Sequence, residues 1–146
     1  MSNIWINEIE ANGTSGVDDD GNGYIDDIHG YNFVGVDSVD PMDNQSHGTH
    51  VAGTIGAVGN NGIGLTVVTW NVKLMALKVC PGRFCDSAAI LQAVEYAVQN
   101  GASVLNLSLG GPGYSQTAKN VYDTAAQSVI IVAAAGNDSR CIGPDT

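Results

Sequence analysis

The chain has 146 residues, of which 44% are apolar, and this length and composition predict one globular domain or part of one. The formal net charge of −10 argues against a nucleic acid or an anionic membrane surface as a partner and favours the binding of cations. The first residues do not resemble a signal peptide, and the longest strongly apolar run, residues 129–135, is far shorter than the ~20 residues of a membrane span.

Residues 1–45 are polar, rich in Asn, Asp and Gly, and have little periodicity apart from a β-like patch at 31–34. Such a segment is either a long loop with a function or a disordered tail. We therefore expect an acidic insertion over residues 1–45, followed by a core of alternating strands and helices over residues 46–146.

Oxygen-bearing side chains alternate in the acidic loop, which we define as residues 18–27. Counted from Asp18, side-chain oxygens stand at positions 1, 3, 5, 9 and 10, and a backbone carbonyl is expected at position 7. In order, these residues are Asp18, Asp20, Asn22, Tyr24, Asp26 and Asp27. Hard cations prefer such a ring of oxygens, so the pattern predicts a calcium site.

The acidic loop differs from an EF-hand, because position 12 is His29 instead of Glu and no amphipathic helices flank the loop. These differences favour a free-standing calcium loop that is closed by Asp26 or Asp27. A solvated turn rich in Asp, Asn and Gly is the alternative.

The run S-H-G-T-H-V-A-G at residues 46–53 places a histidine at the start of a helix of small side chains that ends near Ala57. Ser46 or Asn44 is expected to cap this helix. His47 and His50 could be ordinary polar residues or a zinc pair. The known helical zinc pair, however, has an i, i+4 spacing with a Glu between, and this segment has neither.

After a turn at residues 59–64, strand-like and helix-like segments alternate. They are a strand at 72–79, a helix with an apolar stripe at 89–98, a strand at 104–109, a helix at 115–127 and a strand at 128–135. Asp86 or Ser87 is expected to cap the first of these helices, and Gly101 to end it. The order β-α-β-α-β predicts an α/β fold with a mainly parallel sheet that is flanked by helices on both sides.

Functional loops of a parallel sheet lie at the carboxyl ends of its strands. In this chain those positions are residues 108–113 and the pair Gly136 and Asn137.

Three cysteines leave at least one thiol unpaired within the chain, so the sequence does not fix the redox compartment. Cys80 and Cys85 could close a small disulfide loop. Free or metal-binding thiols remain the alternative.

Three sequence blocks together resemble the subtilisin-like serine proteases, or subtilases (peptidase family S8). They are S-H-G-T-H-V-A-G at 46–53, N-L-S-L-G-G-P at 106–112 and A-A-A-G-N at 133–137, and they stand in the order in which the family has them. Residues 18–33 also resemble an insertion in the calcium-loaded branch of the family. The resemblance covers nearly the whole chain and implies an incomplete three-layer subtilisin-like α/β domain.

The resemblance implies hydrolysis of a polypeptide substrate through an acyl-enzyme. His47 corresponds to the general base and Asn137 to the donor that stabilises the oxyanion. Ser108, Leu109, Gly110 and Gly111 correspond to the substrate-binding strand and turn. Asn61 resembles a ligand of the family's high-affinity calcium site. The family also implies a secreted or vesicular location and an inhibitory propeptide as a further partner.

Two catalytic motifs of the family do not occur in this sequence. The catalytic Asp stands in D-T-G or D-S-G, and the nucleophile in G-T-S-M-A. Gly13-Thr14-Ser15-Gly16 lies before the histidine block and is rejected as the nucleophile. We therefore expect a central fragment that needs the missing remainder of the catalytic domain and is inactive alone. A catalytically dead binding module, or one chain of a split protease, is the alternative.

Overall fold

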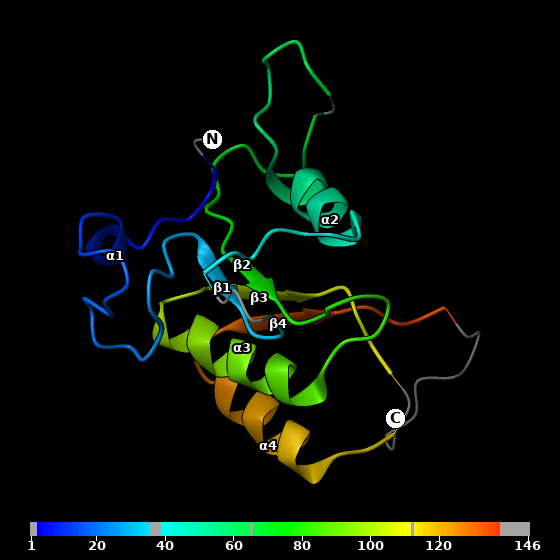
Figure 1. The fold of residues 1–146 in the computed structure, drawn as a ribbon. Helices are drawn as coiled ribbons and strands as arrows, with labels where there is room; N and C mark the ends of the chain where they lie inside the picture. The colour runs from blue at the N-terminus through cyan, green and yellow to red at the C-terminus, as the bar shows by residue number, and fades with distance from the viewer. Residues whose placement is uncertain (1–2, 36–38, 65, 112, 138–146) are drawn as a thin grey trace. The chain divides into compact units, whose positions relative to one another are not determined.

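The computed structural model describes residues 3–35, 39–64, 66–111 and 113–137 (Figure 1). The chain divides into two compact units, Met1–Ala93 and Val94–Thr146. Both contain helices and parallel strands, which confirms the α/β class and an incomplete subtilisin-like fold. Within the described ranges, no helix is both long and apolar enough to cross a membrane.

The first unit holds a small parallel sheet. Its elements are α1 (Glu8–Ala11), β1 (Gly30–Asn32), α2 (His47–Gly56), β2 (Ala76–Lys78) and the first part of α3 (Ser87–Gln99). Gly30 pairs with Ala76 and Asn32 with Lys78, so β1 and β2 run side by side (Figure 1). The expected long N-terminal loop thus contains a short helix and a strand. The expected strand at 72–79 is regular only over β2.

α2 is held at its C-terminal end by contacts with residues that are distant in sequence. A side chain at Gly56 would bring its Cβ to 2.3 Å from Val72 Cγ1, so only glycine allows this close approach. The buried Asn3 side chain donates a hydrogen bond to the Gly56 carbonyl at 2.8 Å. These contacts explain the glycine at position 56.

α3 begins and ends at the signals that the sequence predicts. Asp86 Oδ1 accepts a hydrogen bond from the Ala89 backbone N–H at 2.9 Å, which makes Asp86 the capping residue. Gly101 has a φ of +74°, the left-handed conformation that commonly follows a helix. The apolar stripe is confirmed by the burial of Ala89 and Ala93 in the first unit.

The second unit contains the last residues of α3, then β3 (Val104–Leu107), α4 (Gln116–Ala125) and β4 (Ile130–Ala133). β3 and β4 are parallel neighbours, with Val104 beside Ile130 and Leu107 beside Ala133 (Figure 1). The Ser115 hydroxyl accepts a hydrogen bond from the Ala118 N–H and caps α4. Tyr96 and Ala97 are buried in this unit.

The two faces of the β3–β4 sheet differ in exposure. Side chains alternate between the faces, so Val104, Ile130 and Val132 share one face, and they are 54%, 65% and 49% exposed. Leu105 points to the other face and is only 6% exposed. Three apolar side chains on one face of this strand pair are therefore exposed among the described residues.

Candidate active site

His47 is the first residue of α2, and its side chain is exposed. The preceding Ser46 has a φ of +66° and makes no side-chain cap hydrogen bond. Asp43 takes that role, because its Oδ2 accepts the Thr49 backbone N–H at 2.8 Å. The predicted cap at Ser46 or Asn44 was therefore wrong, since a side-chain cap needs extended backbone at the capping residue.

The Asp43 carboxylate also accepts the Gln45 backbone N–H at 2.7 Å. The hydrogen bond from Thr49, followed by that from Gln45, lowers the pKa of Asp43 from 3.8 to about 2. The carboxylate is therefore ionised near neutral pH, where a negative charge at the start of a helix is favourable.

In the second unit, the loops after β3 and β4 lie at the same end of a parallel pair. Asn106 Nδ2 donates to the Ser108 hydroxyl at 2.9 Å, and Ser108 and Leu109 are half-buried. Gly110 and Gly111 are exposed, and a Cβ at either position would meet no atom within 4 Å. The predicted substrate-binding residues thus border open space.

Asn137 follows β4 at the same edge of the sheet. The Ala134 N–H donates to the Leu107 carbonyl at 3.1 Å, which continues the parallel ladder past the regular strand. Gly136 then has a φ of +81°, and the Asn137 side chain after it is exposed. The sheet therefore brings the predicted oxyanion donor and the predicted substrate strand to one edge.

The acidic loop folds back on α1 through a residue that the loop pattern did not include. Glu10 is only 3% exposed, and its Oε1 accepts the Asp19 N–H at 2.7 Å and the Asp20 N–H at 3.1 Å. Its Oε2 accepts the Asp26 N–H at 2.9 Å. Glu10, Asp18 and Asp20 each bring a carboxylate oxygen within 4.8 Å of the others. Nothing in the spacing of the loop marked Glu10, because it lies upstream in α1.

Asp27, which is fully buried, stands at the base of the acidic loop. Asn7 Nδ2 donates to Asp27 Oδ1 and to Asp20 Oδ2, both at 2.8 Å. Asn22 Nδ2 donates to the other Asp27 oxygen at 2.9 Å. Two neutral amides thus join Asp20 and Asp27 into one network.

The other predicted metal ligands have separate contacts. Asp26 Oδ2 accepts the Gly16 N–H at 2.8 Å, and the Tyr24 N–H donates to Asn22 Oδ1 at 2.7 Å. Asn61 lies in a different, exposed loop, where its Oδ1 accepts the Ile63 N–H at 3.0 Å. The structure thus brings Asp18 and Asp20 together with Glu10 and keeps Asn61 in a loop of its own.

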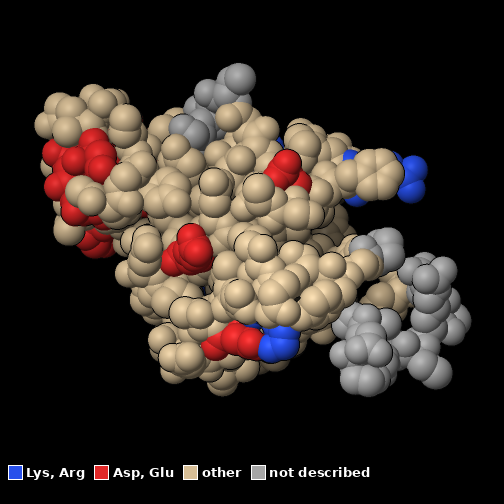
Figure 2. Space-filling view, turned by 90° about the horizontal axis from the view of Figure 1, so that it is seen from below, with Lys and Arg blue, Asp and Glu red and all other residues tan. Residues whose placement is uncertain are grey.

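Figure 2 shows Asp and Glu side chains gathered over the region of α1 and the loop that follows it, with no Lys or Arg among them on that face. A shallow cavity of about 420 Å³ adjoins this region. It is lined by Asn22, Gly23, Tyr24, Tyr31, Asn32, Phe33, Gly35 and Gln92. None of the residues that correspond to catalytic residues lines this cavity.

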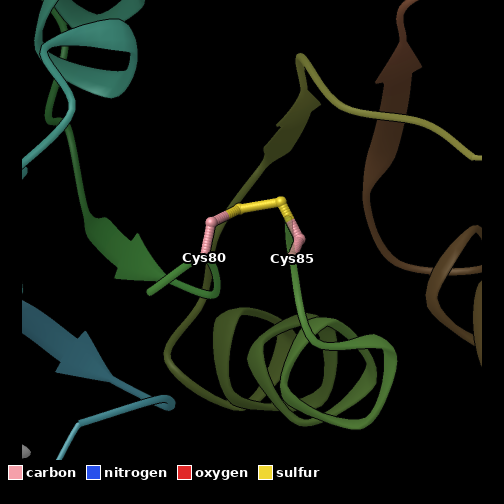
Figure 3. The surroundings of a disulfide bond; sticks show 2 residues. All are labelled: Cys80 and Cys85. Carbon is pink, nitrogen blue, oxygen red and sulfur yellow. A yellow bond between two sulfur atoms is a disulfide. The ribbon is translucent and has the colours of Figure 1, made fainter. Parts of the chain in front are cut away.

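Cys80 and Cys85 form a disulfide between the end of β2 and the start of α3, with their Cα atoms 3.9 Å apart (Figure 3). The same loop is closed at its base by a hydrogen bond from the Asp86 N–H to the Val79 carbonyl at 3.0 Å. Phe84, inside the loop, is 85% exposed. The disulfide thus shapes a short, exposed loop next to the cap of α3.

The family model of the subtilase family matches residues 7–146. The chain is 40% identical to subtilisin-like protease 1 of Plasmodium vivax over 130 residues, which cover 86% of this chain and 19% of that protein. It is 43% identical to subtilisin DY of Bacillus licheniformis over 112 residues, which cover 75% of this chain and 40% of that protein.

The chain thus spans about a fifth of the length of the Plasmodium vivax protease. The family match extends from the acidic segment through the histidine helix and past Asn137. The chain belongs to the subtilase family.

Proposed function

We propose that this chain is the central part of the catalytic domain of a serine endopeptidase, which hydrolyses polypeptides through an acyl-enzyme. The observation that carries this proposal is the parallel pairing of β3 with β4, because residues 108–111 and Asn137 then follow the two strands at the same end of the pair. The name of the Plasmodium vivax relative, subtilisin-like protease 1, supports the same reaction class.

In this proposal each residue has a distinct role. His47 is the general base that takes the proton from a serine hydroxyl supplied by a segment that this sequence does not contain. The Asn137 side chain donates a hydrogen bond to the oxyanion of the tetrahedral intermediate. Backbone groups of Ser108, Leu109 and Gly110 pair with an extended substrate, and Gly111 leaves room for its side chain.

We also propose that the remainder of the catalytic domain is the first partner of this chain. Val104, Ile130 and Val132 expose one apolar face of the β3–β4 pair, whereas parallel sheets are ordinarily covered on both faces. Alone, the chain lacks the nucleophile motif, and we expect it to be inactive. An inhibitory propeptide is a further proposed partner on family grounds.

Calcium is the proposed cofactor, and the described contacts fit it. Glu10, Asp18 and Asp20 bring three carboxylates together, while their named hydrogen-bond donors are neutral amides. Glu10 is buried and the two aspartates are half-buried, and charge that is partly withdrawn from water in this way favours a balancing cation. Calcium prefers oxygen ligands, so we assign its binding to Glu10, Asp18, Asp20, Asn22, Tyr24, Asp26 and Asp27, with Asn61 in a second site.

A secreted or vesicular location is proposed as well. Disulfides persist mainly in oxidising compartments, and Cys80 and Cys85 form one here.

Substitutions in the proposed full-length protease that contains this chain, called the parent protease below, test the proposed roles. We expect His47→Ala to reduce kcat by roughly 10⁶ and Asn137→Ala by roughly 10²–10³, the losses known for the corresponding residues in subtilisin, a member of this family. His50→Ala is the matched control, because His50 is also exposed on α2 but has no proposed role. Equal losses for His47→Ala and His50→Ala would contradict the assignment.

The inactivity of the isolated chain has its own test. A fluorophosphonate probe that reacts with activated serines should label the parent protease and leave the isolated chain unlabelled. Labelling of the isolated chain would show that it carries its own nucleophile.

A further inference from the structure

Four asparagines in this chain are followed by glycine: Asn12, Asn22, Asn61 and Asn100. In such a pair the glycine backbone nitrogen can attack the asparagine side-chain carbonyl, because glycine has no side chain to obstruct the ring that forms. The reaction needs a free glycine N–H and a side-chain amide that can turn toward it. The four pairs differ in whether the glycine N–H is free and in how firmly the asparagine side chain is held.

Three of the four pairs are held by two or more hydrogen bonds. At Asn12 the side chain donates to the Glu8 carbonyl at 2.7 Å, and the Gly13 N–H donates to the Glu10 carbonyl at 3.2 Å. At Asn100 the side chain donates to the Tyr96 carbonyl, and the Gly101 N–H to the Val98 carbonyl.

Asn22 is held most extensively. Its Nδ2 donates to Asp20 and Asp27, its Oδ1 accepts the Tyr24 N–H, and the Gly23 N–H donates to Asp18 Oδ2 at 2.8 Å. In all three pairs, both the attacking nitrogen and the side-chain amide must first lose their partners.

The pair Asn61 and Gly62 is held less than the other three. Both residues are exposed, and the Gly62 N–H has no hydrogen-bond partner among the described residues. The Asn61 side chain makes one contact, in which its Oδ1 accepts the Ile63 N–H at 3.0 Å. This is the one printed contact that holds the pair among the described residues, whereas two or more hydrogen bonds hold each of the other pairs.

We propose that Asn61 is the preferred site of spontaneous deamidation in this protein. The Gly62 nitrogen forms a bond to Asn61 Cγ, the bond from Cγ to the amide nitrogen breaks, and that nitrogen leaves as ammonia with the proton from Gly62. Water then opens the cyclic imide at either carbonyl and gives aspartate or isoaspartate. Atoms balance with water as the only co-reactant, and no oxidant or reductant is needed.

The modification adds one negative charge to the loop at residues 59–64, and the isoaspartate product lengthens the main chain there by one carbon. The proposal concerns the loop without calcium, because coordination of the Asn61 side-chain oxygen would hold the amide in place. It stands whether or not the chain belongs to an active protease.

Peptide mapping by mass spectrometry tests the proposal directly. The full chain is incubated with a calcium chelator in mildly alkaline buffer, and conversion is followed at all four pairs. We expect Asn61 to react about ten- to a hundredfold faster than the other three, because those pairs must break two or more hydrogen bonds first. In concentrated urea the four rates should converge. A native rate at Asn12, Asn22 or Asn100 that equals or exceeds the rate at Asn61 overturns the proposal.

Two variants sharpen the test. Asn61→Gln should abolish the early acidic species in isoelectric focusing, because glutamine would have to close a larger ring. Asn71→Gln is the matched control, since Asn71 is also exposed but precedes Val72, and it should leave that species unchanged. Persistence of the early acidic species in Asn61→Gln would also overturn the proposal.

Discussion

The Asp43 carboxylate lies 2.8 Å from the Thr49 backbone nitrogen, so a residue before His47 satisfies an amide in the first turn of α2. This contact fixes the start of the helix that carries His47. Ser46, between them, adopts a left-handed conformation that leaves its own hydroxyl outside the cap.

The first prediction concerns stability. Asp43→Ala should lower the free energy of unfolding by about 1 kcal/mol, because it removes the side-chain acceptor at the helix start. Asn44→Ala is the control, since Asn44 is exposed and does not cap α2. Urea denaturation of the three proteins measures both differences. A larger loss of unfolding free energy for Asn44→Ala than for Asp43→Ala would show that Asn44 caps α2, as the sequence predicts, and would contradict the assignment of Asp43.

The second prediction concerns pH. Hydrogen bonds from Thr49 and Gln45 lower the pKa of Asp43 from 3.8 to about 2. Since the pKa is lower in the folded state, the stabilisation is complete above about 3.8 and is lost as the pH falls toward about 2. The stability difference between wild type and Asp43→Ala should therefore be constant near neutral pH and shrink over that window. A difference that grows on acidification would contradict the cited contacts.

The third prediction concerns calcium. Glu10→Gln should weaken calcium binding by about tenfold or more, because a charged oxygen ligand becomes a neutral one. Glu8→Gln is the matched control, since Glu8 lies in the same short helix but is exposed and outside the cluster. Calorimetric titration of the three proteins measures the affinities. If chelation leaves the melting temperature of the wild type unchanged, the calcium assignment is wrong.

The fourth prediction concerns the disulfide. Replacing both Cys80 and Cys85 by Ser should lower the free energy of unfolding by roughly 2 kcal/mol, the value for closure of a very short loop. Cys141→Ser is the control, although Cys141 lies outside the described residues. In urea unfolding, a reductant should lower the free energy of unfolding of the wild type and leave that of the double variant unchanged.

The sequence alone predicted the features that depend on neighbouring residues. Apolar periodicity located α3 and α4, and the cap at Asp86 and the stop at Gly101 followed from short-range backbone chemistry. The three motif blocks predicted the family, because motif order is itself a property of the sequence. The alternation of strands and helices predicted a mainly parallel sheet, and β3 and β4 are parallel neighbours.

The tertiary structure decided the features that depend on distant residues or on one backbone angle. Glu10 joins Asp18 and Asp20 only because α1 folds back on the acidic loop, and no periodicity encodes that approach. Asp43 caps α2 because Ser46 has a positive φ and its hydroxyl makes no cap hydrogen bond. The regular strands proved shorter than the apolar runs, since strand length depends on hydrogen bonds to a partner and not on hydrophobicity alone.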